Sequence, residues 1–164
     1  MVLRRLQRAV PAVVLVACHG NICRSPFAAG LLRREIDGRG IRVESAGFVG
    51  FDRPPPPEAL AAAARCGLDL SGHRSRPLAR TLVFEADLIV VMDAAQRRAL
   101  CDRFGCSPGA VIVLGDLDPE RIGTRGIPDP VNQPAEAFDE CYARIERCAR
   151  ALARAIAAAA ERPA

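Results

Sequence analysis

The chain contains no tryptophan and no lysine, and aromatic residues make up only 4% of its 164 residues. Sparse aromatics argue against a surface on which nucleic-acid bases stack, so we expect no nucleic-acid partner. No apolar run reaches the roughly 18 residues that span a bilayer, so we expect no membrane insertion. The 23 basic residues are all arginines, scattered along a chain whose net charge is +4. This mild and dispersed charge gives little support to an electrostatic binding surface.

The number and spacing of the cysteines indicate the redox environment of the protein. Seven cysteines are an odd count at irregular spacings, which does not resemble a disulfide scaffold. We therefore expect reduced thiols and a cytoplasmic location. With half of its residues hydrophobic, the chain is long enough for one well-packed core, so residues 1–164 are expected to form a single domain.

Apolar segments alternate with segments of helical pattern. Strands are expected over 12–18, 41–47, 86–93 and 110–115, and helices over 25–38, 57–67, 94–105 and 135–160. Ser25 suits the N-cap of the first helix and Gly38 its end. An apolar stripe is expected along the last helix, formed by Phe138, Cys141, Ile145, Cys148, Leu152 and Ile156. The pattern predicts an α/β fold with a parallel sheet covered by helices on both faces.

The stretch "LVACHGNICRSP" (15–26) at the end of the first strand has two competing interpretations. One is a lipoprotein signal, in which Arg4, Arg5 and Arg8 precede an apolar run and Cys18 is the lipidated residue. Cleavage before Cys18 would, however, remove the first strand of the sheet. The other interpretation, which we favour, is a phosphate-binding loop between a strand and a helix.

Residues 18–25 have the pattern C-x5-R-S, which suits such a loop. Gly20 permits backbone conformations in which successive N–H groups point inward, at the positive end of the following helix. Arg24 supplies a planar, two-pronged donor for phosphate oxygens. The same positive field stabilises a thiolate on Cys18 and makes it a nucleophile. One loop can therefore bind a phosphate and activate the group that attacks it.

The segments "CHGNICRSP", "ESAG", "LSGHRSR", "LIVVMD" and "PDP" occur in the order and spacing of the low-molecular-weight protein tyrosine phosphatases, which the chain resembles over nearly its whole length. The resemblance implies an α/β fold with a doubly wound four-stranded parallel sheet of strand order 2-1-3-4, and a phosphatase that uses neither cofactor nor metal. The implied phosphate-binding loop consists of Cys18, His19, Gly20, Asn21, Ile22, Cys23, Arg24 and Ser25.

Each role follows from the resemblance residue by residue. Cys18 is implied to be the nucleophile and Arg24 the phosphate clamp. Ser25 is implied to ease the departure of the sulfur, and Asn21 to hold the loop in shape through Ser45 and His73. Asp129 is implied to be the general acid, although by itself it would be an ordinary turn residue before proline. Asp93 is expected only to cap the helix that follows it.

The chain departs from the family where an aromatic residue usually follows the Asp-Pro pair. Here Val131 stands in its place, so the substrate slot is expected to comprise His19, Val131 and Phe51, with Phe48 as a second aromatic candidate. This puts tight selection for phosphotyrosine in doubt. A second loop cysteine is also common in the family, so Cys23 is expected to protect Cys18 from irreversible oxidation by forming a disulfide with it.

Two alternative functions use the same kind of loop. Thiol-dependent arsenate reduction needs further cysteines, for which Cys101 and Cys106 are the available pair, but Met92 stands where such relatives carry a cysteine. Phosphoarginine phosphatases tend to have threonine where this chain has Ile22. The resemblance implies a phosphotyrosine-protein substrate, a monomer, and a bacterial tyrosine kinase of exopolysaccharide export as the opposing enzyme.

Overall fold

A four-stranded, entirely parallel sheet forms the centre of the protein. The computed structural model describes residues 10–120 and 122–161. The strands are β1 (Val13–Cys18), β2 (Arg42–Gly47), β3 (Leu88–Val91) and β4 (Val111–Val113), arranged in the order β2-β1-β3-β4. The predicted fold class and strand order are confirmed.

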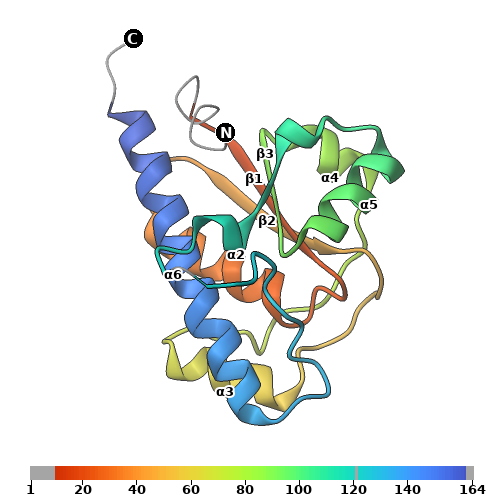
Figure 1. Ribbon diagram of the computed structural model, residues 1–164, viewed down its shortest axis with the longest axis vertical. Coiled ribbons are helices and arrows are strands. Elements are labelled where there is room, and N and C mark those ends of the chain that lie inside the picture. Colours follow the sequence, from red (N-terminus) through yellow and green to blue (C-terminus); the bar gives the residue numbers. More distant parts are fainter. Residues whose placement is uncertain (1–9, 121, 162–164) are drawn as a thin grey trace.

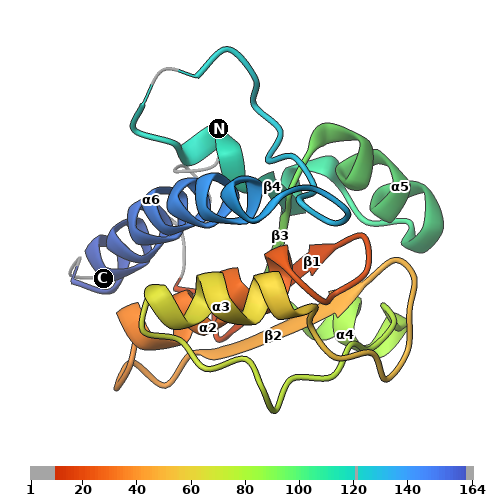
Figure 2. The same cartoon turned by 90° about the horizontal axis from the view of Figure 1, so that it is seen from below.

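Helices cover both faces of the sheet. On one face lie α2 (Arg24–Glu35), α3 (Pro57–Arg65) and α6 (Ala135–Ala160), and on the other α4 (Arg80–Glu85) and α5 (Ala94–Phe104) (Figures 1 and 2). Successive strand residues point to opposite faces, so β1 contributes to both cores. Val14 and Val16 pack in the core under α2 and α6, while Leu15 and Ala17 pack in the core under α4 and α5. All four side chains are fully buried, which explains the continuous apolar run of this strand.

Two local predictions were wrong. Helix α2 begins at Arg24 with Cys23 at the N-cap position, and it ends at Glu35 instead of at Gly38. Ser25 lies in the first turn, where its hydroxyl contacts the Cys18 sulfur and therefore does not cap the helix. The short helix α4 lies between the predicted helix 57–67 and the predicted strand 86–93, where the sequence predicts no helix. A helix of six residues has too few turns to show a clear apolar period.

Short 3₁₀ helices flank the last strand. The first, η1, spans Pro108–Ala110, and the second, η2, spans Leu114–Leu117. They take up both ends of the predicted strand 110–115, so β4 itself is shorter than expected.

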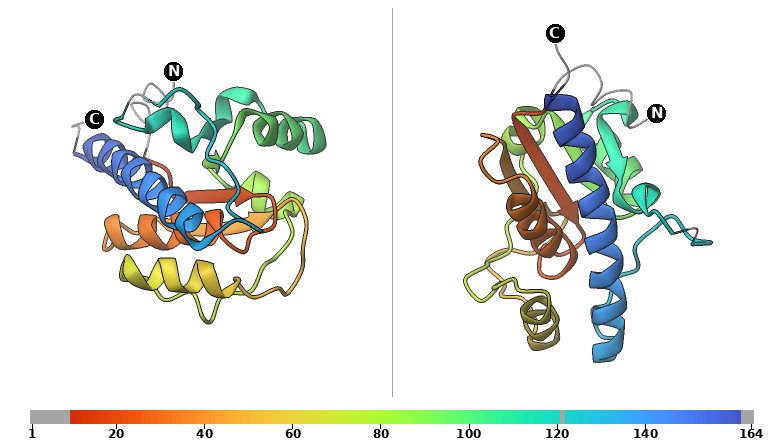
Figure 3. Two further views of the ribbon diagram at one scale, coloured as in Figure 1. Left: turned by 60° about the horizontal axis from the view of Figure 1, so that its bottom comes forward. Right: turned by 90° about the vertical axis from the view of Figure 1, so that its left-hand side faces the viewer.

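The long helix α6 lies against α2 and α3, as both views of Figure 3 show. Its predicted apolar stripe is confirmed, because all six of the residues named for it are buried. Tyr142 on the same face stacks on Phe27 of α2, with ring centroids 3.8 Å apart and planes inclined by 8°. The Tyr142 hydroxyl donates a hydrogen bond to the Cys23 carbonyl oxygen, 3.2 Å away. Helix α6 therefore supports the loop that precedes α2.

Strand β1 pairs with β2 on one side and β3 on the other. Cleavage before Cys18, as the lipoprotein interpretation requires, would remove the strand that joins these two. Arg4, Arg5 and Arg8 of that interpretation lie outside the described residues. Within residues 10–120 and 122–161, no helix is both long and apolar enough to cross a membrane.

Candidate active site

The predicted phosphate-binding loop surrounds a small hollow at the carboxyl end of β1. Cys18, His19, Gly20, Ile22, Cys23 and Arg24 line this hollow, whose volume is about 70 Å³. Arg53, Asp129 and Val131 complete the lining from distant parts of the chain. The structure thus brings the C-x5-R-S loop together with the Asp-Pro segment, at the sheet edge where ligands of parallel sheets bind.

Two donors converge on the Cys18 sulfur. The Ser25 hydroxyl lies 3.0 Å from Cys18 Sγ, and the Asn21 backbone N–H donates to the same sulfur at 3.3 Å. Asn21 Nδ2 donates to Ser25 Oγ at 2.9 Å, which leaves the hydroxyl proton free to point at the sulfur. The sulfur thus receives hydrogen bonds from a side chain and from the backbone of its own loop.

Asn21 occupies a strained backbone position that its neighbours hold in place. Its φ is +52°, in the left-handed region that asparagine tolerates better than most residues. Its Nδ2 also donates to Ser45 Oγ at 3.0 Å, and its Oδ1 accepts from the Arg76 backbone N–H at 3.0 Å. His73 Nε2 lies 2.7 Å from the Asn21 carbonyl oxygen, and since a carbonyl only accepts, the proton is on Nε2. The predicted contacts of Asn21 with Ser45 and His73 are therefore present.

Burial lowers the pKa of His73, and the nearby Arg33, Arg74 and Arg76 act in the same direction. The imidazole is therefore neutral near pH 7, with its Nε2 proton committed to the loop. This arrangement fits a structural role for His73.

Gly47 is the last residue of the segment "ESAG", and the sequence alone indicates no role for it. It pairs with Cys18 across β1 and β2, at the point where the phosphate-binding loop turns back over the sheet. A Cβ at this position would lie 2.9 Å from the His19 carbonyl oxygen and 3.0 Å from Asn21. Only glycine lets the loop approach β2 this closely.

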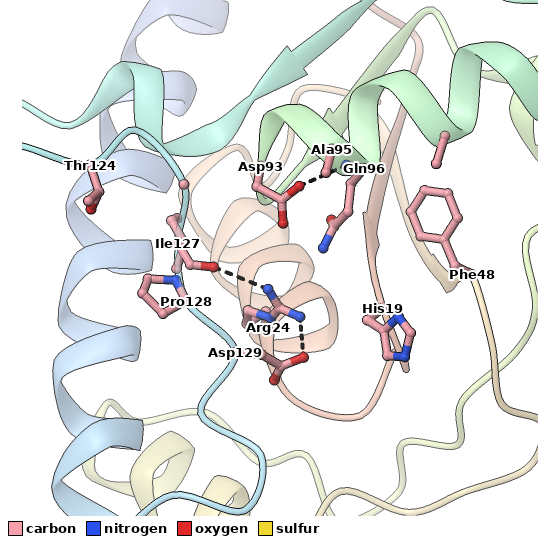
Figure 4. Close-up of a pocket in the computed structure, with 12 residues that line it drawn as sticks. His19, Arg24, Phe48, Asp93, Ala95, Gln96, Thr124, Ile127, Pro128 and Asp129 are labelled. Carbon is pink, nitrogen blue, oxygen red and sulfur yellow. Dashed lines mark hydrogen bonds and ion pairs between the residues drawn. The ribbon is translucent and has the colours of Figure 1, made fainter.

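Arg24 and Asp129 form an ion pair above the hollow (Figure 4). Arg24 Nη1 also donates to the Ile127 carbonyl oxygen at 3.1 Å, and the Val131 N–H donates to Asp129 Oδ1 at 3.3 Å. Arg24 is 3% exposed, and its Nε is buried without a hydrogen-bond partner among the described residues. A buried guanidinium N–H with no acceptor is costly, so this atom is suited to a ligand oxygen.

The segment that carries Asp129 is held in place by a buried arginine, Arg144, whose role the sequence does not indicate. Arg144 of α6 donates to the carbonyl oxygens of Thr124 and Gly126 and to Asp118. Burial alone would raise the pKa of Asp118, but hydrogen bonds from Arg147 and Arg144 outweigh it and lower that pKa. Arginines on a helix are usually solvated, so their spacing in sequence gives no sign of this role.

A cysteine of α6 contacts the same segment. The Cys141 thiol lies 3.6 Å from the Pro128 carbonyl oxygen, and burial raises its pKa to about 12. It is therefore a neutral donor. Helix α6 thus contacts both the phosphate-binding loop, through Tyr142, and the segment of Asp129, through Arg144 and Cys141.

A larger cavity adjoins the hollow on the side of α5. Its volume is about 700 Å³, and Phe48, Gln96, Ala99 and Ile127 are among the residues that line it. Phe51, predicted for the substrate slot, is 77% exposed and lines neither space. Phe48, the second aromatic candidate, lines the larger cavity.

The remaining predicted residues have simpler surroundings. Asp93 caps α5 as expected, since its Oδ1 accepts from the Gln96 N–H at 2.7 Å. The sulfurs of Cys101 and Cys106 are 3.5 Å apart, but neither residue lines the hollow. Within the described part of the chain, no group of three histidine, cysteine or acidic side chains could hold a metal ion.

Comparison with known proteins gives consistent results. The family model described as low molecular weight phosphotyrosine protein phosphatase matches residues 13–162. The probable low molecular weight protein-tyrosine-phosphatase EpsP of Ralstonia nicotianae is 39% identical over 82% of this chain and 88% of its own length. The tyrosine phosphatase Wzb from Escherichia coli K30, in complex with sulphate, superposes with a TM-score of 0.78 at 30% identity, covering 87% of this chain and 96% of Wzb. The YwlE arginine phosphatase from Geobacillus stearothermophilus superposes with a TM-score of 0.77 at 26% identity, covering 87% and 91%.

Proposed function

Because the chain belongs to the low molecular weight phosphotyrosine protein phosphatase family, we propose that it hydrolyses phosphotyrosine in protein substrates through a cysteinyl-phosphate on Cys18. One observation carries the proposal. The same hollow holds a sulfur that receives two hydrogen bonds and a buried Arg24 N–H without a partner. In a phosphate monoester dianion, the phosphorus is the electrophile that the sulfur can attack, and a phosphate oxygen is the acceptor that the Arg24 N–H lacks.

In the first step, the Cys18 thiolate attacks phosphorus while Arg24 binds the equatorial oxygens. The S–P bond forms as the bond to the phenolic oxygen breaks. As the substrate phosphate takes over Arg24, Asp129 gives up its contact with the arginine and takes up a proton from solvent. It then delivers this proton to the phenolic oxygen, so tyrosine leaves as a neutral phenol. The proximity of Asp129 to Arg24 supports this assignment, because the arginine marks where the phosphate lies.

In the second step, the Asp129 carboxylate accepts a proton from water, whose oxygen attacks phosphorus. The S–P bond breaks, and inorganic phosphate leaves with the sulfur again a thiolate. The Ser25 hydroxyl and the Asn21 N–H stabilise the negative charge that returns to the sulfur. The groups used in both steps lie between Cys18 and Asp129, and the steps involve no metal or cofactor.

A matched set of phosphopeptides tests the proposed substrate class. The same peptide sequence is prepared with phosphotyrosine, phosphoserine and phosphoarginine, and kcat/KM is measured for each. We expect phosphotyrosine to be preferred, because Ile22 in the wall of the hollow is bulky and apolar. A preference for phosphoarginine would instead support the activity named for YwlE. Arsenate reduction is disfavoured because Cys101 and Cys106 do not line the hollow.

Replacing Val131 with tyrosine should sharpen selection for phosphotyrosine. Val131 lines the hollow, and an aromatic ring there can stack on the substrate ring. The KM for a phosphotyrosine peptide should fall by about twofold to tenfold, the range of one aromatic pair. The KM for an alkyl phosphate should change less.

Gln133→Tyr is the control for this prediction, because Gln133 is exposed and lines neither space. Equal changes for both substrates would mean that position 131 does not face the ring.

Replacing Cys23 with serine should remove protection against oxidation. Peroxide converts the Cys18 thiolate to a sulfenic acid. The Cys23 sulfur can then attack the Cys18 sulfur, so that the S–O bond breaks, water is lost and a disulfide forms. Both cysteines are buried and line the hollow. Burial raises the pKa of Cys23, so Cys18 is expected to react with peroxide first. The parent should regain activity when a dithiol is added after peroxide, whereas Cys23→Ser should not.

Cys66→Ser, at a half-buried cysteine outside the hollow, should recover like the parent. Full recovery of Cys23→Ser would show that Cys23 only packs beneath the loop.

The biological setting rests on the family resemblance. We propose a phosphorylated bacterial protein as substrate, a tyrosine kinase of exopolysaccharide export as the opposing enzyme, a monomeric state and a cytoplasmic location. Size-exclusion chromatography with light scattering measures the oligomeric state directly.

A further inference from the structure

The larger cavity beside the active site, here called the α5 cavity, has walls of fixed position. Phe48 forms one wall, Ala95 and Ala99 on adjacent turns of α5 form another, and Ile127 and Pro128 form the third. The Phe48 carbonyl oxygen accepts a hydrogen bond from Arg103 at 3.4 Å, and the Ile127 N–H donates to the Met92 carbonyl oxygen at 2.9 Å. The walls are thus tied to α5 and to the end of β3.

The polar groups of the α5 cavity are already partly engaged within the protein. Gln96 Oε1 accepts from the Met92 N–H at 3.1 Å, and Asp93 Oδ1 accepts from the Gln96 N–H. Figure 4 shows the Gln96 side chain extending from α5 between Asp93 and the Phe48 ring, with its amide nitrogen directed away from the helix. A few placed polar groups among mainly apolar walls are typical of ligand sites, and a volume of about 700 Å³ lies within their usual range.

The α5 cavity is continuous with the proposed catalytic site. His19, Arg24 and Asp129 line both the hollow and the cavity. The hollow, at about 70 Å³, is a tenth as large and can take the phosphate but not the polypeptide that carries it. Neighbouring Cα atoms are about 3.8 Å apart, so side chains one or two residues from a bound phosphotyrosine are close enough along the peptide to enter the adjoining cavity.

We propose that the α5 cavity binds an apolar side chain located within two residues of the phosphotyrosine in a protein substrate. This proposal rests on the phosphatase function above and specifies its substrate class. Phe48, Ala99 and Ile127 would contact the apolar side chain, and the Gln96 amide would donate to a main-chain carbonyl oxygen beside it. Burial of one such side chain is expected to improve kcat/KM by about tenfold to hundredfold.

The test compares phosphotyrosine peptides that differ by leucine or serine at each of the two positions before and after the phosphotyrosine. The parent enzyme should prefer leucine over serine at one of these positions by about tenfold to hundredfold. Ala99→Trp, at the exposed rim of α5, fills the cavity and should reduce this preference to less than about threefold. Ala95→Trp fills the same space from the adjacent turn and should act in the same direction.

Arg98→Trp is the matched control, because Arg98 lies on the same helix but is exposed and does not line the cavity. It should keep both the leucine preference and the rate on p-nitrophenyl phosphate. The proposal is overturned if the parent has no leucine preference, or if both filling variants keep it. Absence of activity of the parent on p-nitrophenyl phosphate and on every peptide would instead overturn the phosphatase function itself.

Discussion

Cys18→Ser should lose essentially all turnover of phosphotyrosine peptides and of p-nitrophenyl phosphate. A hydroxyl at this position remains protonated at neutral pH, so the nucleophile of the first step is lost, and kcat should fall by about 10⁴-fold or more. The loop itself should survive, because serine can keep the contacts with Ser25 and the Asn21 N–H. Inorganic phosphate should therefore still bind, because the loop and Arg24 that contact it are unchanged.

Turnover is measured with p-nitrophenyl phosphate, and phosphate binding by calorimetry. Cys66→Ser serves as the control, because this cysteine lies outside the hollow at the end of α3. If Cys18→Ser retained more than a tenth of the parent rate, the cysteinyl-phosphate mechanism would be wrong. Loss of phosphate binding together with turnover would indicate that the substitution had damaged the phosphate-binding loop.

Asp129→Ala should slow hydrolysis by about 10²-fold to 10⁴-fold, the usual contribution of a general acid. The loss should be largest for phenols of high pKa and small for leaving groups that are already stable anions. The ion pair with Arg24 adds a second expectation. In the parent, phosphate must displace the Asp129 carboxylate from Arg24 in order to bind. In Asp129→Ala there is no carboxylate to displace, so the inhibition constant of inorganic phosphate should decrease.

A series of aryl phosphates with graded leaving-group pKa measures the first effect, and competitive inhibition by phosphate measures the second. Asp139→Ala removes another exposed carboxylate that is paired with an arginine, Arg65, on the surface of α6. It should change neither quantity. A uniform loss across all leaving groups would assign Asp129 to positioning of Arg24 and not to proton transfer.

Local sequence was sufficient to predict most of the fold. The apolar run in β1, the periodic face of α6 and the Asp93 cap of α5 each depend on residues close in the chain. Because strand and helix periods differ, the alternation of the two was visible, and with it the parallel sheet covered on both faces. The Cys18 loop was also predictable, because one short segment contains its nucleophile, its glycine and its arginine.

Tertiary structure alone decided how distant segments complete the site. Arg144 and Asp118 hold the segment of Asp129, and Gly47 admits the loop against β2, but no local pattern marks these residues. The α5 cavity likewise lies between the loop that joins β2 to α3, helix α5 and the segment of Asp129. These parts of the chain meet only in the folded protein. Phe51, predicted for the substrate slot, lines neither the hollow nor the α5 cavity, while Phe48 lines the α5 cavity. The reason is physical: period and capping act over a few residues, whereas burial and pocket shape depend on which elements pack together.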